Sequence, residues 1–306
     1  MRRVDQLIWP VVLLFGGAWL AGCQQTGEAL TSRKERENAE EIQQYVVANN
    51  LQATQIGNTG AFFTRLVSAP TSQSAGIGDE VRFFVTSRRF DGMVIDSTDG
   101  VRPVVYAYGS QPNRVNTLQN GSYLYTNITN GMFLGLTVAR EGERIAVLVP
   151  SSLDAGRVGT LVLPQYSPIR YDMRILSIKT EDKQIEEYIA ANKISVTKKL
   201  DNGIRIATTL ARPDSALITP GQSVTVNYTG RFMDGTRFDS RADSSYNFVI
   251  GKNQAVPGFD LGLQQARRGE KLFLVFPSAL GYGATGRGSI GPYKPLAFEL
   301  AIVRVK

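Results

Sequence analysis

Histidine is absent from this chain of 306 residues, and cysteine occurs once. Without histidine, the chain cannot form a Ser-His or Cys-His catalytic pair or a zinc site with imidazole ligands. A single cysteine excludes an internal disulfide, an iron–sulfur cluster and a cysteine-rich metal site. We therefore expect neither a metal site nor a cofactor.

Hydrophobic residues make up 42% of the chain and charged residues 20%, a composition typical of a globular protein. The length is sufficient for two domains with packed cores. The net charge is +7, but the basic residues are scattered along the chain. Because a basic composition alone does not indicate nucleic-acid binding, we expect no nucleic-acid partner.

The N-terminal segment has the pattern of a targeting signal. Arg2 and Arg3 precede an apolar stretch over residues 7–22 that Pro10 interrupts. A membrane-spanning helix needs about 20 apolar residues, so this shorter stretch predicts a signal peptide over residues 1–22.

This segment ends in Leu20-Ala21-Gly22-Cys23, which resembles a bacterial lipobox and holds the one cysteine of the chain. The alternative is a signal anchor in which the cysteine is incidental. The lipobox interpretation predicts that Cys23 is lipidated and begins the mature protein, followed by a flexible polar tether that ends at residue 33. We then expect the protein in the cell envelope, held by its lipid at the outer membrane on the periplasmic or the surface side.

The rest of the chain is a tandem duplication of one unit. With a shift of 143 residues, 16 of the 56 positions from 42 to 97 are identical to those from 185 to 240. With a shift of 127 residues, 14 of the 41 positions from 135 to 175 are identical to those from 262 to 302. The first copy therefore carries 16 extra residues between Asp99 and Gly131, where Asn, Gly and Tyr predict a surface loop.

Each copy begins with a helical pattern and continues with strands. Apolar residues spaced i, i+3, i+4 over residues 42–46 and 185–189 predict one helix before each copy. In the second copy, we predict strands over residues 224–228, 271–276 and 296–302, and one short helix that contains Phe259. Several strands with one helix and no βαβ alternation indicate an antiparallel α+β domain.

Two short motifs resemble catalytic patterns without the context that those patterns need. Residues 281–286 match G-x-G-x-x-G, but the glycine-rich sequence after them cannot begin a helix, and Arg287-Gly288 does not fit a Walker loop. Ser195-Val196-Thr197-Lys198 has S-x-x-K spacing but no partner motif. We therefore expect no nucleophile and no acid–base pair.

Aromatic residues recur in the second copy at positions 228, 238, 246, 248, 259, 282 and 298. From the pattern alone, rings at alternating strand positions indicate a core rather than a site. A family resemblance changes this interpretation.

Residues 203–305 resemble an FKBP-type peptidyl-prolyl isomerase domain along their full length. The resemblance rests on five ordered motifs: Val226-Asn227-Tyr228-Thr229-Gly230, Asp234-Gly235-Thr236-Arg237-Phe238-Asp239-Ser240, Val256-Pro257-Gly258-Phe259, Leu280-Gly281-Tyr282-Gly283-Ala284-Thr285-Gly286 and Ile290-Gly291-Pro292-Tyr293. It implies a curved antiparallel sheet around one short helix. Together with the duplication, it predicts two tandem FKBP-like domains of the α+β class, each preceded by a helix.

The resemblance also implies site residues, in which a prolyl ring would lie on Phe259 inside an aromatic pocket. The implied catalytic residues are Tyr228, Phe238, Asp239, Val256, Phe259, Tyr282 and Phe298. The implied substrate-binding residues are Tyr246, Ala255 and Ile290. Such a site needs no acid, base or metal, because an apolar pocket disfavours the planar amide more than its less polar twisted state.

The first copy has lost most of these rings. The two shifts place Val85, Ile95, Met132 and Ala155 at the positions of residues 228, 238, 259 and 282, and keep Asp96 and Tyr171. We predict that the first copy folds like the second but does not isomerise proline.

The expected organisation is a signal peptide over 1–22, a lipidated tether over 23–33, a degenerate domain with its leading helix over 34–178, a connecting helix over 179–202 and an isomerase domain over 203–306. The leading hypothesis is a lipid-anchored isomerase that assists the folding of envelope or secreted proteins, with proline-containing polypeptides as clients. The alternative is a non-catalytic accessory lipoprotein that joins an envelope protein complex through its N-terminal domain.

Overall fold

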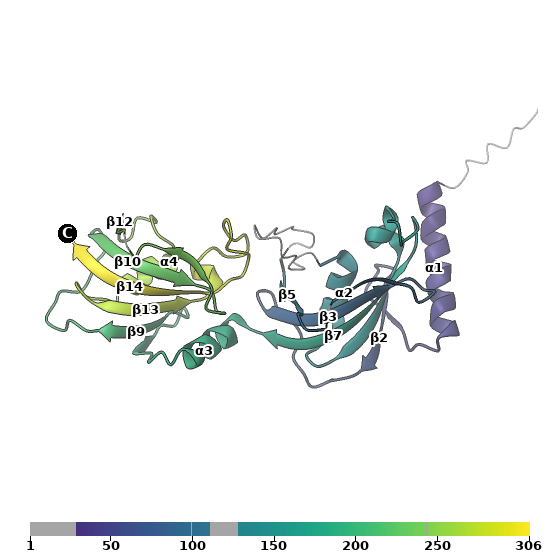
Figure 1. The fold of residues 1–306 in the computed structure, drawn as a ribbon, viewed down its shortest axis with the longest axis horizontal. Helices are drawn as coiled ribbons and strands as arrows, with labels where there is room; N and C mark the ends of the chain where they lie inside the picture. Colours follow the sequence, from purple (N-terminus) through teal and green to yellow (C-terminus); the bar gives the residue numbers. More distant parts are fainter. Residues whose placement is uncertain (1–28, 99, 111–127, 243) are drawn as a thin grey trace, which may run out of the picture.

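The computed structural model describes residues 29–98, 100–110, 128–242 and 244–306. Two similar domains lie side by side along the long axis, joined where strand β7 (Ile169–Lys179) leads into helix α3 (Glu181–Ala191) (Figure 1). The predicted signal peptide and Cys23 lie outside the described residues, as does the greater part of the predicted insertion, residues 111–127.

The first domain follows helix α1 (Leu30–Ala48). Its other elements are β1 (Thr54–Gln55), β2 (Phe62–Val67), β3 (Glu80–Arg88), β4 (Val94–Ser97), β5 (Val104–Ala107), α2 (Asn130–Val138), β6 (Arg144–Val149), the short 3₁₀ turns η1 (Ser151–Leu153) and η2 (Ala155–Arg157), and β7. The second domain follows α3. Its other elements are β8 (Lys198–Lys199), β9 (Arg205–Leu210), β10 (Ser223–Arg231), β11 (Arg237–Ser240), β12 (Tyr246–Val249), α4 (Pro257–Leu263), β13 (Lys271–Phe276), η3 (Ser278–Leu280) and β14 (Leu296–Val305).

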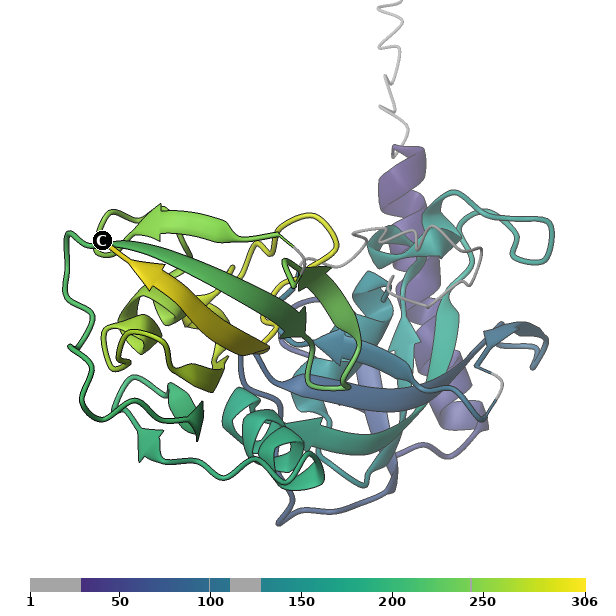
Figure 2. The same cartoon turned by 60° about the vertical axis from the view of Figure 1, so that its left-hand side comes forward.

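The two sheets have the same topology; Figure 2 views the two domains with the second one in front. The strand order is β1-β2-β6-β7-β3-β4 in the first, with β5 also paired to β3. It is β8-β9-β13-β14-β10-β11 in the second, with β12 also paired to β10. Neighbouring strands are antiparallel in both sheets. The prediction of two antiparallel α+β domains is therefore confirmed.

Glycine lets each short helix approach its sheet closely. In the second domain, a Cβ added at Gly258 of α4 would lie 2.5 Å from ring atoms of Phe276. In the first domain, a Cβ at Gly135 of α2 would lie 2.6 Å from Sδ of Met173. Real Cβ atoms do not approach so closely, so a larger residue would push the helix off the sheet. This close approach brings Phe259 of α4 onto the strands, where it is 3% exposed.

Helix α3 covers the outer face of the second sheet. Ile185, Tyr188 and Ile189 pack there with Val275 of β13 and Ala297 of β14. Because side chains alternate along a strand, the neighbours of these two strand residues point inward to the core around α4. The apolar stripe predicted for this helix is therefore buried within its own chain.

A buried arginine fixes α3 to β9. The guanidinium of Arg205, whose side chain is 2% exposed, forms ion pairs with Asp182 and Glu186 of α3. Hydrogen bonds from Arg205 lower the pKa of both carboxyls. Helix α1 is held to the first domain in a related way, since Arg170 of β7 donates a 2.9 Å hydrogen bond to the Tyr45 hydroxyl.

Two predicted boundaries are wrong. Helix α1 begins at Leu30, so the last part of the predicted tether is helical; ion pairs of Arg33 and Lys34 with Glu37 stabilise its first turns. The predicted connecting helix over 179–202 is too long. Helix α3 ends at Ala191, the φ angle of Lys193 is +53°, and residues 198–199 form β8 in the second sheet.

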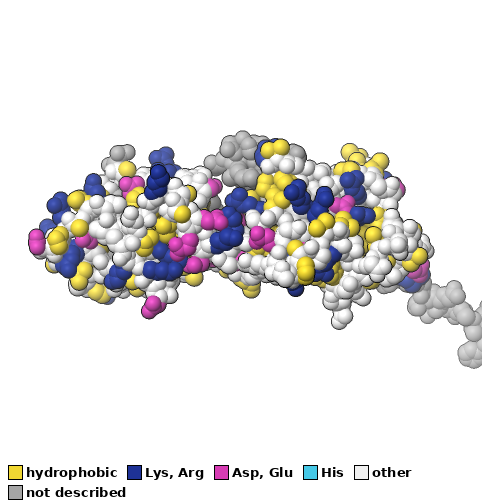
Figure 3. Space-filling model, turned by 90° about the horizontal axis from the view of Figure 1, so that it is seen from below, with side chains coloured by type: hydrophobic (Ala, Val, Ile, Leu, Met, Phe, Trp, Pro, Cys, Tyr) yellow, Lys and Arg dark blue, Asp and Glu magenta, His cyan; other side chains and the backbone are white. Residues whose placement is uncertain are grey.

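No helix among the described residues is long and apolar enough to cross a membrane. On the face drawn in Figure 3, basic side chains lie interspersed with acidic ones. This agrees with the scattered basic residues of the sequence.

Candidate functional site

Phe298 of β14 lies at the centre of a cluster of aromatic rings in the second domain. Its ring centroid is 4.6 Å from that of Phe259 at an interplanar angle of 87°, 5.5 Å from that of Phe238 and 5.8 Å from that of Tyr228. The first two of these partners come from α4 and β11, and the third comes from β10. These edge-to-face contacts are the arrangement that the ring quadrupole favours. Three strands and one helix thus meet at one residue.

Gly230 creates the space for this arrangement. It pairs with Phe298 across β10 and β14 and with Asp239 across β10 and β11. A Cβ at Gly230 would lie 2.7 Å from Cζ of Phe238 and 2.9 Å from Cε1 of Phe298. Any side chain at this position would displace both rings, so the Tyr228-Thr229-Gly230 sequence is what lets them lie across β10.

The rings differ in exposure in a way that separates a floor from a rim. Phe259 and Phe298 are 3% and 5% exposed. The side chains of Tyr228, Phe238 and Tyr246 are half-buried and pack against the same core. We call Phe259 and Phe298 the floor of the cluster and Tyr228, Phe238 and Tyr246 its rim. The rim rings are partly exposed to solvent and lie above the buried floor.

Asp239 is tied to the rim. The Tyr228 hydroxyl donates a 2.6 Å hydrogen bond to Oδ2 of Asp239, and the backbone N–H of Ser240 donates a 2.8 Å bond to Oδ1. Burial raises the pKa of Tyr228, and the hydrogen bond to Asp239 raises it further. The phenol therefore stays neutral and the carboxylate stays fixed beside it.

Tyr246 is held by a different partner. Its hydroxyl donates a 2.6 Å hydrogen bond to the backbone oxygen of Gln254, and its ring stacks on Phe248 at 5.2 Å. Burial raises its pKa as well. The bond to Gln254 also fixes the segment that leads to Ala255 and Val256, which are half-buried against the core at the start of α4.

The loop after η3 supplies the last two predicted residues. The guanidinium carbon of Arg287 lies 5.9 Å from the ring centroid of Tyr282, which packs half-buried against the core. Ile290 is 8% exposed and belongs to that core. All ten predicted site residues of the second domain thus lie in the cluster, against the same core, or, for Asp239, hydrogen-bonded to it.

Two aromatic rings of the cluster were not predicted from the sequence. Phe232, which follows β10, lies 4.9 Å from Phe238, and Phe276 of β13 stacks on Phe298 at 5.6 Å and 16°. The Phe276 position was part of a predicted strand, and its inward direction follows from the alternation along β13. Phe232 precedes the turn at Gly235, and no periodic pattern marks it.

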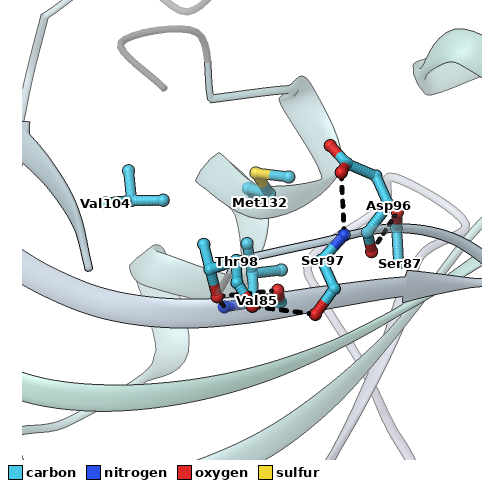
Figure 4. Close-up of a pocket in the computed structure, with 7 residues that line it drawn as sticks. All are labelled: Val85, Ser87, Asp96, Ser97, Thr98, Val104 and Met132. Carbon is cyan, nitrogen blue, oxygen red and sulfur yellow. Dashed lines mark hydrogen bonds between the residues drawn. The ribbon is translucent and has the colours of Figure 1, made fainter. Parts of the chain in front are cut away.

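The first domain holds a hollow where the second has its rings (Figure 4). Strand register gives the correspondence: Ser87 pairs with Asp96 and Tyr171, as Gly230 pairs with Asp239 and Phe298. The hollow has a volume of about 280 Å³, including space open to solvent, and is lined by Val85, Ser87, Asp96, Ser97, Thr98, Val104 and Met132. Val85 and Met132 thus stand where the second domain has Tyr228 and Phe259.

The position of Phe298 is taken in the first domain by Tyr171, whose hydroxyl has its own partner. It donates a 2.9 Å hydrogen bond to Oδ2 of Asp154, which also accepts a 2.9 Å bond from the backbone N–H of Gly131 at the start of α2. Burial and the Asp154 charge raise the pKa of Tyr171. This pair ties α2 to the sheet, which is a structural role.

In the described part of the chain, no group of three or more Asp, Glu, Cys or His side chains could hold a metal ion. What the second domain offers is an apolar surface of rings with a single carboxylate at its edge. Such a surface can bind an apolar ring and exclude water from it, without moving a proton.

Comparisons with known proteins give one family for this chain. A family model described as FKBP-type peptidyl-prolyl cis-trans isomerase matches residues 215–303, a range that contains the whole cluster. Peptidyl-prolyl cis-trans isomerase FKBP15-3 of Arabidopsis thaliana is 36% identical over 138 residues, 42% of this chain and 96% of that protein. The FK506-binding protein of Neisseria meningitidis serogroup C is 40% identical over 88 residues, 28% of this chain and 81% of that protein. Mouse peptidyl-prolyl cis-trans isomerase FKBP9 is 26% identical over 232 residues, which are 74% of this chain and 35% of that longer protein.

Proposed function

The chain belongs to the FKBP-type peptidyl-prolyl cis-trans isomerase family, and on that premise we propose that its second domain interconverts the cis and trans forms of X–Pro bonds in polypeptides. The observation that carries the proposal is the ring cluster. The half-exposed rings of Tyr228 and Phe238 lie over the buried rings of Phe259 and Phe298, with a fixed carboxylate beside them.

The cluster suits this reaction because the reaction needs no proton transfer. Rotation about the X–Pro bond faces a barrier of about 18–20 kcal/mol, since amide resonance is lost as the bond twists. The twisted amide is less polar than the planar one. An apolar surface therefore destabilises the ground state more than the transition state.

Rigid rings contribute a second effect. Phe259 and Phe298 are fixed by edge-to-face contacts with their neighbours, so a pyrrolidine packed on them keeps its place while the preceding carbonyl swings. The Tyr228 hydroxyl is already bonded to Asp239, which restrains this ring of the rim. We assign positioning of the proline to the floor and desolvation of the amide to the rim.

We assign the activity to the second domain alone. In the first domain, Val85 and Met132 stand at the positions of Tyr228 and Phe259, and none of the described residues that line the hollow is aromatic. The hollow thus lacks the counterparts of the Tyr228 and Phe259 rings, one from the rim and one from the floor.

The place of action that we propose is the cell envelope. The Leu20-Ala21-Gly22-Cys23 sequence supports lipid attachment at Cys23, and the polar stretch before α1 would set the domains away from the bilayer. Clients would then be envelope or secreted polypeptides with slow X–Pro bonds. Incorporation of a radiolabelled fatty acid, present in the natural sequence and lost in Cys23→Ser, tests the anchor.

A protease-coupled assay with a proline-containing peptide tests the activity. The chain from residue 24 onward should accelerate isomerisation, and Phe238→Ala should reduce kcat/KM by at least about tenfold because it removes a rim ring. Ile95→Ala, the equivalent change in the first domain, is the matched control and should leave the rate unchanged. A wild-type rate equal to background, or equal rates for Phe238→Ala and Ile95→Ala, would support the accessory role instead.

A further inference from the structure

The loop that carries Tyr282 and Ile290 is held at its first end by helix α3. Glu181, the first residue of α3, accepts two hydrogen bonds from Ser278: 2.5 Å from the backbone N–H to Oε2 and 2.7 Å from the hydroxyl to Oε1. Ser278 is 3% exposed, so water does not compete freely for these bonds. Its own backbone oxygen accepts a 2.8 Å bond from the N–H of Gly283, next to Tyr282.

The other end of the loop rests on the first domain. A Cβ at Gly78 would lie 3.5 Å from Cδ1 of Tyr293, and a Cβ at Gly109 would lie 3.5 Å from its Oη. The next residue, Lys294, places its Nζ 3.8 Å from Oε2 of Glu80 on β3. The same turn at Gly78 also approaches Glu181, whose Oε1 would lie 3.1 Å from the added Cβ. Both ends of the loop are thus fixed by groups that lie outside the sheet carrying the ring cluster.

Between these ends the loop is cross-linked to itself. The backbone N–H of Tyr293 donates to the oxygen of Gly283 at 2.9 Å, and Arg287 and Ile290 exchange backbone bonds of 2.8 and 3.0 Å. Because these bonds make the loop rigid, a displacement of Ser278 or of Tyr293 also displaces Tyr282 and Ile290.

We call the contacts that Glu181 and Tyr293 make at the two ends of this loop the clasp. The first domain contains an equivalent clasp that is formed within the domain and its own leading helix. Asn38 of α1 is the counterpart of Glu181 and accepts a 2.7 Å bond from the N–H of Ser151. Its amide also donates a 2.9 Å bond to the backbone oxygen of Tyr166, the counterpart of Tyr293. A carboxylate cannot donate such a bond. In the second domain the far end of the loop is therefore held by the neighbouring domain instead.

We propose that Glu181 and Tyr293 are positioning residues for the isomerase site, through which α3 and the first domain set the place of Tyr282 and Ile290. This gives the degenerate domain a role in substrate binding without a site of its own. The inference rests on the proposed function for its effect on activity, whereas the clasp itself can be measured independently.

The experiment compares Glu181→Ala and Tyr293→Ala with Glu187→Ala in the full chain. Glu187 lies on the same helix, is exposed and pairs with Lys179 at 2.5 Å, away from the loop. Amide hydrogen exchange should become about three- to tenfold faster at Gly283 and Ile290 in the first two variants, because a net hydrogen bond contributes roughly that factor. Exchange in β10 and β14 should not change. Glu181→Gln, which keeps an acceptor oxygen, and Tyr293→Phe, which keeps the ring, should restore protection.

Activity provides the second measurement. The clasp variants should raise KM by about three- to tenfold with kcat nearly unchanged, because they loosen a substrate contact rather than the ring floor. Equal exchange in Glu181→Ala and Glu187→Ala would overturn the proposal, and so would faster loop exchange with an unchanged KM. An inactive wild-type protein would contradict the proposed function and with it the catalytic role of the clasp, while the exchange data would still decide whether the clasp exists.

Discussion

The Tyr228 hydroxyl and Oδ2 of Asp239 lie 2.6 Å apart across strands β10 and β11. The equivalent aspartate of the first domain, Asp96, accepts the same 2.8 Å bond from the following N–H, but the counterpart of Tyr228 is Val85, which has no hydroxyl. Val85 thus lacks both the ring and the hydroxyl of its counterpart Tyr228. The two domains differ at their sites in this way although their sheets have the same topology.

The Tyr228–Asp239 bond has a measurable effect on titration. Because the bond to Asp239 adds to burial in raising the pKa of Tyr228, Asp239→Asn should lower that pKa while leaving it above the ordinary value. Tyrosine ring carbon shifts followed by NMR from pH 8 upward measure it. Asp96→Asn is the control and should have no effect. An unchanged Tyr228 titration in Asp239→Asn would show that the bond does not form in solution.

The hollow of the first domain leaves more room beside Val85 than the core leaves beside Val81. Val85 lines it, whereas Val81 on the same strand is fully buried. We expect Val81→Phe to lower the free energy of unfolding by about 1–3 kcal/mol and Val85→Phe to lower it by less, since only Val85 borders open space. Urea denaturation of the two variants measures the difference. Equal losses would mean that the hollow is closed in solution.

The close approach of α4 to its sheet predicts a glycine requirement. A Cβ at Gly262 would lie 2.5 Å from Cδ1 of Leu274, and one at Gly291 would meet no atom within 4 Å. Gly262→Ala should therefore reduce the free energy of unfolding by about 1–3 kcal/mol, and Gly291→Ala by less than about 0.5 kcal/mol. Thermal denaturation is sufficient to separate them. A similar Tm for both variants would contradict the packing described for α4.

The ion pairs of Arg205 predict a pH dependence. Hydrogen bonds from Arg205 hold the pKa values of Asp182 and Glu186 below 3.8 and 4.5, their ordinary values. Such groups stabilise the fold above those values, and the stabilisation is lost as the pH falls through their lowered pKa values.

The stability difference between the natural protein and Arg205→Met should therefore shrink between pH 6 and pH 3. Because the carboxylates are 64% and 50% exposed, the pH-dependent part should stay below about 1 kcal/mol. Lys179→Met, which removes a surface partner of Glu187, should leave the pH profile unchanged. A difference that is constant over this range would mean that the carboxylates titrate normally.

Much of this architecture follows from the sequence, because its signals are local or repeated. The alternation over 224–228 and the stripe at Ile185 predicted elements that the structure contains. The duplication predicted a second domain of the same topology. In the strand register, Asp96 corresponds to Asp239 and Tyr171 corresponds to Phe298, as the two shifts predicted.

The parts that could not be predicted depend on contacts between distant segments. Glu181 was visible only as an acidic residue in the first turn of a helix, yet it binds Ser278, 97 residues away. The end of α3 before β8 is set by pairing with β9, which no local pattern shows. The placement of Tyr293 on Gly78 requires both domains at once.

The central claim is that the ring cluster of the second domain lowers the barrier to twisting an X–Pro bond. Two-dimensional exchange NMR on a proline-containing peptide, with the protein at catalytic concentration, observes that interconversion without a coupling protease. We predict cis–trans exchange peaks with the natural protein and with Val85→Phe, and their loss with Tyr228→Val, which gives the second domain the residue of the first. Exchange that is no faster with the natural protein than in the peptide alone would contradict the claim.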